Sequence, residues 1–269
     1  MAGRRVVVLG AAGRMGSTVC QAVSGDPALE LAAAVDPAFA AGAEAPAGAR
    51  AAGSLGELAG EDLDVAVDFT TAGAVLLSAG WCAREGVHLV CGTTGLDDAG
   101  LATLRRLFGE PQAPNCILAP NFAISAVLMM RLAELAARFF DGAEIVELHH
   151  GAKRDAPSGT ALETARRIVA ARAASGAGPF APDPTTEGLA GARGARVEGE
   201  GGVAVAVHGV RLPGLVAHQE VIFGASGQSL TIRQDSYDRF SFMPGVLLAV
   251  HEVASRPGLT VGLEPLLGI

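Results

Sequence analysis

The sequence predicts an α/β protein, in which a Rossmann-like dinucleotide-binding domain is joined to an α+β domain with a mixed sheet. Three observations predict this class. Short strand patterns alternate with helical patterns over the first ~120 residues, as in a parallel sheet with crossover helices. A glycine-rich turn follows the first strand pattern. Four further strand patterns lie in the second half of the chain and are enough for a second sheet.

The five strand patterns of the first domain are short runs rich in Val, Leu and Ile, bounded by turn residues. They lie at residues 6–9, 29–35, 65–69, 87–91 and 116–119. Apolar side chains of Met15, Val19, Ala22 and Val23 share one helical face, which indicates a helix after the first strand. Two more helical patterns lie at 74–84 and 101–108.

The second half begins with the longest helical pattern, at residues 124–140. A strand is expected at 143–149 and a helix at 159–173, and residues 176–202 have no clear period, which predicts a long surface loop. Further strands are expected at 203–210, 216–223 and 229–234, followed by a closing helix at 243–254. We expect the dinucleotide domain to comprise 1–122 and 240–269, and the second domain 123–239.

Composition excludes several classes of protein. The chain has 269 residues, of which 50% are hydrophobic, yet no window holds eighteen uninterrupted apolar residues, so no membrane span is expected. The apolar run at 6–9 is broken by Gly10 and Arg14, too early for a signal peptide, so we expect the mature protein to start near Met1. A net charge of −8 with 4% aromatic residues argues against nucleic-acid binding.

The four cysteines, Cys20, Cys82, Cys91 and Cys116, form no CxxC pair, and each lies in or beside an apolar stretch. Buried free thiols in a reducing compartment are the simplest account, so we expect a cytoplasmic protein without a metal site.

The glycine turn reads Gly10-Ala11-Ala12-Gly13-Arg14-Met15-Gly16 and lies between a strand and a helix. Gly10 permits the tight turn, Gly13 lets the backbone approach a pyrophosphate, and Gly16 lets the helix pack closely. The spacing is GxxGxxG rather than the commoner GxGxxG, so the strand–turn–helix context carries the prediction.

Asp36 follows the second strand, where an acidic side chain can accept hydrogen bonds from a ribose 2′-OH. It would repel a 2′-phosphate, and Pro37 offers no cation there, although Arg14 could supply a charge nearby. We therefore expect NADH to be favoured and NADPH to be accepted as well. A glycine-rich turn without a ligand is the simpler alternative.

Three polar clusters follow other strands of the first domain. In an open α/β sheet, ligands bind outside the carboxyl ends of the strands, so these clusters indicate a cofactor groove. Each alone would also suit an ordinary turn. They are Asp68-Phe69-Thr70, Gly92-Thr93-Thr94-Gly95 and Pro120-Asn121-Phe122.

The most informative stretch, residues 147–160, reads Glu-Leu-His-His-Gly-Ala-Lys-Arg-Asp-Ala-Pro-Ser-Gly-Thr. Two histidines and a lysine lie beside Ser158-Gly159-Thr160, which opens a helix and so presents backbone N–H groups to an anion. A site that binds a small carboxylate and moves a proton needs both features. The simpler alternative is a structural histidine and a helix-capping serine.

These motifs together resemble the 4-hydroxy-tetrahydrodipicolinate (dihydrodipicolinate) reductase family of lysine biosynthesis, over nearly the whole chain. The resemblance rests above all on His149-His150-x-x-Lys153-x-Asp155-Ala156-Pro157-Ser158-Gly159-Thr160, which is highly specific to that family. The other matching segments are 10–16, 68–70, 92–95, 119–122, 210–223 and the closing helix.

The resemblance implies that NADH or NADPH reduces 4-hydroxy-tetrahydrodipicolinate, a small dicarboxylate, to tetrahydrodipicolinate with loss of water. It also implies a homotetramer formed through the second domain. His149 matches the family's catalytic proton donor/acceptor and Lys153 its proton donor, and either could be the immediate acid. Substrate binding is expected at His150, Ser158, Gly159 and Thr160. Cofactor contacts are expected at Gly10, Ala11, Ala12, Gly13, Arg14, Met15, Asp36, Gly92, Thr93, Thr94, Ala119, Pro120, Asn121 and Phe122.

The chain departs from the family pattern at one point, since many members carry another histidine directly before the lysine. Gly151-Ala152 stands there instead, which puts any role of that imidazole in doubt. Two rivals stay open at this stage: another two-domain dehydrogenase acting on an amino acid or sugar, and a redox-sensing module that binds NAD(H) without turnover. The first gives no reason for the His-His-x-x-Lys motif beside Ser-Gly-Thr, and the second predicts nucleotide affinity without consumption when a dicarboxylate ring substrate is added.

Overall fold

The computed structural model describes residues 3–269, so the expected start near Met1 lies outside the described residues. The chain divides into two compact units. The first comprises Met1–Ile124 and Arg239–Ile269, and the second comprises Ser125–Asp238. Among the described residues, no helix is long and apolar enough to cross a membrane.

The first unit is built on a seven-stranded sheet in which every strand pair is parallel. The strand order is β12-β6-β5-β4-β1-β2-β3, with β1 near the middle. This topology confirms the predicted parallel sheet with crossover helices. The strands are β1 (Arg4–Leu9), β2 (Leu29–Val35), β3 (Arg50–Ala52), β4 (Val65–Asp68), β5 (His88–Cys91), β6 (Cys116–Leu118) and β12 (Leu259–Val261).

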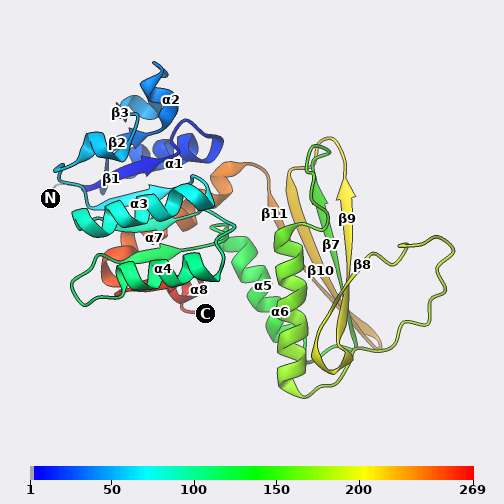
Figure 1. Ribbon diagram of the computed structural model, residues 1–269. Coiled ribbons are helices and arrows are strands. Elements are labelled where there is room, and N and C mark those ends of the chain that lie inside the picture. The colour runs from blue at the N-terminus through cyan, green and yellow to red at the C-terminus, as the bar shows by residue number, and fades with distance from the viewer. Residues whose placement is uncertain (1–2) are drawn as a thin grey trace. The chain divides into compact units, whose positions relative to one another are not determined.

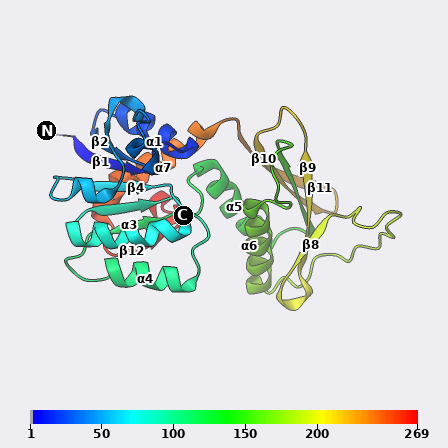
Figure 2. The same cartoon turned by 45° about the horizontal axis from the view of Figure 1, so that its top comes forward.

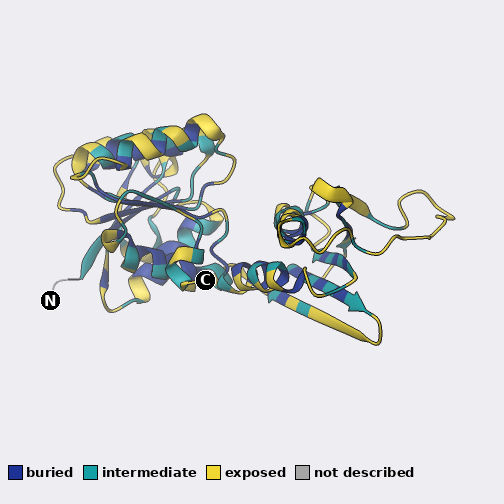
Figure 3. Cartoon of the chain, turned by 90° about the horizontal axis from the view of Figure 1, so that it is seen from below, coloured by how far each residue is buried: buried dark blue, intermediate teal, exposed yellow. Residues whose placement is uncertain are grey.

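Helices cover both faces of this sheet. Figures 1 and 2 show α3 and α4 side by side along one face, while α1 packs against α7. The strands β4 and β6 are buried throughout, and β1 and β5 are buried after their first one or two residues, as expected for a parallel sheet covered on both sides (Figure 3). The helices are α1 (Arg14–Gly25), α2 (Pro37–Ala40), α3 (Ala72–Glu85), α4 (Asp98–Phe108), α7 (Met243–Glu252) and α8 (Glu264–Leu267), with short 3₁₀ turns at Pro46–Gly48, Leu55–Leu58, Arg239–Phe242 and Val253–Ser255.

Two edge strands of this sheet were absent from the sequence-based prediction. Both β3 and β12 are three residues long, too short for an apolar period to identify them. The β12 strand pairs with β6, so the C-terminal segment completes the first sheet. The side chain of Arg4 also donates to the carbonyls of Val250 and His251, which ties β1 to the end of α7.

The second unit has a mixed five-stranded sheet of order β11-β10-β7-β9-β8. The central β7 is parallel to β9 and antiparallel to β10, which confirms the predicted mixed sheet. Helix α6 packs on β7, β8 and β9. The elements are α5 (Ile124–Ala136, whose first residue belongs to the first unit), β7 (Gly142–His149), α6 (Gly159–Ser175), β8 (Ala195–Glu198), β9 (Ala204–Arg211), β10 (Ala217–Ala225) and β11 (Gln228–Ser236).

The prediction of an unbroken loop over 176–202 was wrong at its end. Residues Ala195–Glu198 form the edge strand β8, and Glu200–Gly202 form a 3₁₀ turn. No residue of this edge strand is buried, so the chain segment lacks the apolar alternation that identifies a strand. The residues before β8 do run as a long loop (Figure 1). The predicted helix at 124–140 is also too long, because α5 ends at Ala136.

Candidate active site

The glycine turn of the first unit is closed by backbone contacts. Gly10 has a φ of +74°, and a Cβ there would lie 3.0 Å from the carbonyl oxygen of Phe69. Gly16 packs against the backbone of Gly10 and leaves no room for a side chain. Gly13 caps α1 without any side-chain hydrogen bond, so the first-turn N–H groups stay available to a phosphate.

Asp36 lies directly after β2 and caps α2. Its carboxylate accepts hydrogen bonds from the backbone N–H groups of Ala12, at 3.2 Å, and Ala38, at 3.0 Å. The acid and the glycine turn are therefore joined, as a ribose and a pyrophosphate bound side by side require. A pocket of about 960 Å³ opens here and is lined by residues that include Gly10, Gly13 and Asp36.

The polar clusters after β4 and β5 are joined by one buried carboxylate. Asp68 is fully buried, and its Oδ1 accepts from the Thr70 hydroxyl at 2.6 Å and from the Thr93 hydroxyl at 3.1 Å. The ring of Phe69 fills the place that a Cβ on Gly92 would take, so this position excludes a side chain. The two clusters thus form one edge of the sheet.

The segment after β6 joins the same edge. The ring of Phe122 packs on Phe69, with centroids 5.7 Å apart, and the side chain of Asn121 accepts from the N–H of Ala123. The expected cofactor residues differ in exposure, and the buried ones can act only through their backbone or as support. Exposed are Ala12, Gly13, Arg14, Thr94 and Pro120; half-buried are Gly10, Met15, Asp36, Gly92 and Asn121; buried are Ala11, Thr93, Ala119 and Phe122.

In the second unit, the strand β7 ends at His149. His149 is mostly buried, and its Nδ1 lies 2.6 Å from Oε2 of Glu147. Burial lowers the pKa of His149 below its usual range; Glu147 raises it, and the positive charges of Lys153 and Arg211 lower it further. The imidazole is therefore predominantly neutral at pH 7.

Lys153 lies on the turn between β7 and α6. Its backbone N–H donates to the carbonyl of His150 at 3.1 Å, and its ammonium pairs with Asp155 at 2.9 Å. Asp155 is exposed, and the hydrogen bond from Lys153 lowers its pKa. His150 lies beyond the strand end, so strand alternation does not force it to the face opposite His149.

The helix α6 begins at Gly159 after a capping serine. Ser158 is buried, its hydroxyl accepts from the N–H of Ala161 at 3.2 Å, and its own N–H donates to Glu147. Thr160 is half-buried in the first turn. An α-helix leaves the N–H groups of its first turn unpaired, so Gly159 and Thr160 offer donors to an anion there.

Two residues of this network, Glu147 and Arg211, were absent from the sequence-based site. Arg211 binds the carboxylate of Glu147 through two nitrogens, each at 2.7 Å. Glu147 could have been recognised from the sequence, because it lies on the same strand face as His149 and is a carboxylate on the face that buries Ala143 and Ile145. Arg211 could not have been recognised in this way, since only the β7–β9 register places it opposite His149.

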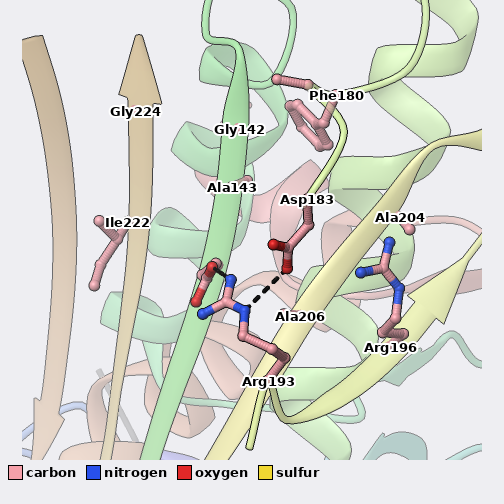
Figure 4. A pocket seen from close by; sticks show the side chains of 12 residues that line it. Gly142, Ala143, Phe180, Asp183, Arg193, Arg196, Ala204, Ala206, Ile222 and Gly224 are labelled. Atoms are coloured by element: carbon pink, nitrogen blue, oxygen red, sulfur yellow. Dashed lines mark hydrogen bonds and ion pairs between the residues drawn. The ribbon is translucent and has the colours of Figure 1, made fainter. Parts of the chain in front are cut away.

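A second pocket, of about 330 Å³, lies on the second unit and is lined in part by Glu144, Asp183 and Arg193 (Figure 4). Arg193 pairs with both acids, and His208 contacts Glu144 at 2.8 Å. None of the residues expected at the active site lines this pocket.

Comparisons with known proteins show the family of this chain. Residues 4–122 match the N-terminal model of dihydrodipicolinate reductase, and residues 125–267 match its C-terminal model. The chain belongs to the dihydrodipicolinate reductase family.

Relatives of this family match over nearly the full chain. The 4-hydroxy-tetrahydrodipicolinate reductases of Cutibacterium acnes and Thermobifida fusca are 52% and 50% identical, each covering 98% of this chain and 99% of its own length. A dipicolinate-bound dihydrodipicolinate reductase from Paenisporosarcina sp. TG-14 is 38% identical with a TM-score of 0.85, covering 98% of this chain and 99% of that one. The family and its Rossmann-like first unit imply a nicotinamide cofactor.

Other solved structures are similar to this chain in fold alone. A myo-inositol dehydrogenase from Corynebacterium glutamicum is 17% identical with a TM-score of 0.56, over 95% of this chain and 90% of its own. The architecture is thus shared with dehydrogenases of other substrates, and only the residues of the site distinguish them.

Proposed function

We propose that this enzyme reduces 4-hydroxy-tetrahydrodipicolinate to tetrahydrodipicolinate with NADH or NADPH, in the biosynthesis of diaminopimelate and lysine. One hydride and one proton enter, and the hydroxyl group leaves as water, so the reaction balances. The observation that carries the proposal is the joining of His149, Lys153 and the start of α6 by the short turn after β7.

The first unit holds the dinucleotide, which supplies a hydride when bound. The N–H groups at the start of α1 meet the pyrophosphate, and Asp36 accepts from the adenosine ribose. Since a carboxylate repels a 2′-phosphate, NADH binds at least as tightly as NADPH.

The second unit holds the dicarboxylate substrate. The N–H groups of Gly159 and Thr160, the Thr160 hydroxyl and the dipole of α6 hold one carboxylate, while His150 contributes a further polar contact. The hydroxyl oxygen of Ser158 caps α6, and its O–H can donate to the same carboxylate. Lys153 pairs with negative charge, and either Lys153 or His149 gives the proton as charge develops on the ring.

The proposal includes an oligomeric state, the homotetramer, and a compartment, the cytoplasm. The four cysteines are free and buried, which suits the reducing cytoplasm. We place homotetramer contacts on the second unit, whose β11 carries exposed residues along most of its length. Light scattering of the purified protein measures the mass directly, and a monomer would contradict this assignment.

One assay separates the proposed function from its rivals. The purified protein is mixed with NADH, freshly made 4-hydroxy-tetrahydrodipicolinate is added, and the loss of NADH absorbance is followed, with NADPH in parallel. Turnover supports the proposal. Nucleotide binding without consumption would identify a redox-sensing module, and turnover only with an amino acid or a sugar would identify another dehydrogenase.

A further inference from the structure

Glu147, two residues before His149, is fully buried, and both of its carboxylate oxygens have hydrogen-bond partners. Oε2 of Glu147 contacts His149 Nδ1 at 2.6 Å and accepts from Arg211 at 2.7 Å. Oε1 accepts from Arg211 at 2.7 Å and from the backbone N–H of Ser158 at 3.2 Å. One side chain therefore joins the histidine at the end of β7 to the start of α6.

The sheet is shaped to hold this side chain. Gly209 lies opposite Glu147 in the β7–β9 register, and a Cβ on Gly209 would lie only 3.0 Å from Oε1. Two residues further along the same register, Arg211 lies opposite His149. The alternation of β9 thus leaves space for the carboxylate at one position and supplies its counter-ion at the next position on the same face.

The charge of Glu147 decides the tautomer of His149. Burial alone would raise the pKa of Glu147, but hydrogen bonds from Arg211 and His149 outweigh it and hold the pKa below its usual range. The carboxylate is therefore ionised at neutral pH and can only accept hydrogen bonds. Its contact with Nδ1 then requires the imidazole to carry a hydrogen on Nδ1, which leaves Nε2 to exchange a proton with substrate.

We propose that Glu147, held in place by Arg211, is the positioning residue that fixes His149 as the Nδ1–H tautomer. This inference rests on the proposed function for its kinetic part only. Glu147 also accepts from Ser158 N–H, so the proton-handling histidine and the anion-binding helix start are held by one group. The alternative is a buried ion pair that serves stability alone.

The groups facing His149 set the direction of the expected pH effect. Lys153 and Arg211 lower the pKa of His149, burial lowers it more than either, and Glu147 alone raises it. Replacing the carboxylate by an amide removes the raising influence. The part of the kcat–pH profile that is set by the titration of His149, its pH limb, then moves to lower pH. A variant that only packs less well in the sheet would not move it.

The tautomer itself is measured on the unmodified full-length protein. Nitrogen-15 labelling of histidine, with His149→Gln to assign the signal, gives the chemical shifts of Nδ1 and Nε2 above the pKa of His149. A protonated Nδ1 is expected. A neutral His149 with its hydrogen on Nε2 would overturn the proposal, and this result depends neither on turnover nor on any Glu147 variant that folds poorly.

The kinetic test uses Glu147→Gln, which keeps the shape of the side chain. We expect kcat to fall by on the order of 10–10²-fold, because general acid–base catalysis contributes about 10²–10⁴-fold and only its orientation is lost. KM for the dicarboxylate and the Kd for NADH stay within about twofold. A kcat within twofold of the parent, or an unmoved pH limb, would overturn the positioning role.

Glu144→Gln is the matched control. Glu144 lies on the same strand and also binds a histidine and an arginine, His208 and Arg193, but it lines the second pocket. It should leave kcat and the pH limb unchanged, and an equal loss in both variants would assign the effect to sheet stability and overturn the proposal. If the parent does not reduce the dicarboxylate at all, the proposed function fails, while the tautomer measurement still decides the role of Glu147.

Discussion

The carboxylate of Asp36 accepts a hydrogen bond from the backbone N–H of Ala12, with the two atoms 3.2 Å apart. The acid that follows β2 is therefore fixed to the glycine turn that follows β1. A second backbone bond, from Ala38 N–H at 3.0 Å, holds the other oxygen. Each carboxylate oxygen keeps a further lone pair, so the group is oriented and still able to accept from a ribose hydroxyl.

Replacing Asp36 with Ser should shift the cofactor preference toward NADPH. The variant loses a charged acceptor for the ribose, worth about 1.5–3 kcal/mol, and also loses the repulsion of a 2′-phosphate. We expect the ratio of Kd values for NADH and NADPH to change about tenfold or more. Fluorescence titration of both nucleotides against both proteins measures the ratio.

Asp97→Ser is the control for this change, because Asp97 also caps a helix, α4, and does not line the pocket at Asp36. It should leave both nucleotide affinities unchanged. An unaltered ratio in the Asp36 variant would mean that the ribose binds elsewhere.

Replacing Thr160 with Val should weaken substrate binding and leave nucleotide binding intact. The hydroxyl is lost at the start of α6 while the shape is nearly kept, so one hydrogen bond to a carboxylate disappears. A bond to a charged group is worth about 1.5–3 kcal/mol, which raises KM about tenfold or more. Steady-state kinetics with the dicarboxylate measure the change, and Thr160→Ser should restore most of the affinity.

Pyridine-2,6-dicarboxylate provides an independent check of the same anion site. It carries two carboxylates on a flat ring, so it should inhibit competitively with the substrate and bind the Thr160→Val variant more weakly. Inhibition that does not depend on substrate concentration would place the dicarboxylate somewhere other than the start of α6.

The places of the expected site residues in the fold could be predicted from the sequence, but the partners that orient them could not. Gly10 and Asp36 directly follow strands with clear apolar runs, and His149 ends another, so their positions at strand ends could be predicted. The role of Arg211 could not be predicted, because it depends on which residue of β9 lies opposite His149. The sequence of β9 alone does not determine its register with β7.

The three strands missed by the sequence-based prediction have a common physical cause. The edge strands β3, β8 and β12 are three or four residues long and hold one buried residue between them, so they bury too little apolar surface to impose a period. They form because a neighbouring strand already offers backbone hydrogen bonds. That tertiary pairing, as in β12 with β6, cannot be recognised from local sequence.

Replacing Asp26 with Asn should lower the free energy of unfolding slightly, and by more near pH 6 than near pH 3. Asp26, at the end of α1, pairs with His251 in α7 at 2.8 Å, and this hydrogen bond is the main cause of its lowered pKa. A carboxyl with a depressed folded pKa stabilises the protein above its unfolded pKa of ~3.9, and the contribution is lost as pH falls through the folded value.

The size of this effect is limited by solvent, since the side chain of His251 is 40% exposed. We expect a loss of about 0.2–1 kcal/mol near pH 6 and a smaller loss near pH 3. Thermal unfolding of parent and variant at both pH values measures it. A larger destabilisation at the lower pH would contradict the assigned direction.

Lys153 offers the most direct test of the chemistry. Its ammonium lies on the turn between β7 and α6 and contacts Asp155, an exposed partner that holds it weakly. A loop lysine without a role would be worth within ~0.5 kcal/mol to stability and nothing to rate. Arg154 is the matched control, because it is the next residue, exposed, and also positively charged.

Lys153→Ala should lower kcat by on the order of 10²–10⁴-fold, since the variant loses a proton donor, while thermal stability and NADH affinity stay as in the parent. Arg154→Ala should turn over normally. Lys153→Ala and His149→Ala should combine less than additively, because both groups serve the same transition state. Steady-state kinetics of the two single variants and the double variant measure this coupling. If Lys153→Ala turns over like the parent, Lys153 is not the donor, and the proton must come from His149, oriented by Glu147, in the fraction that carries a hydrogen on both ring nitrogens.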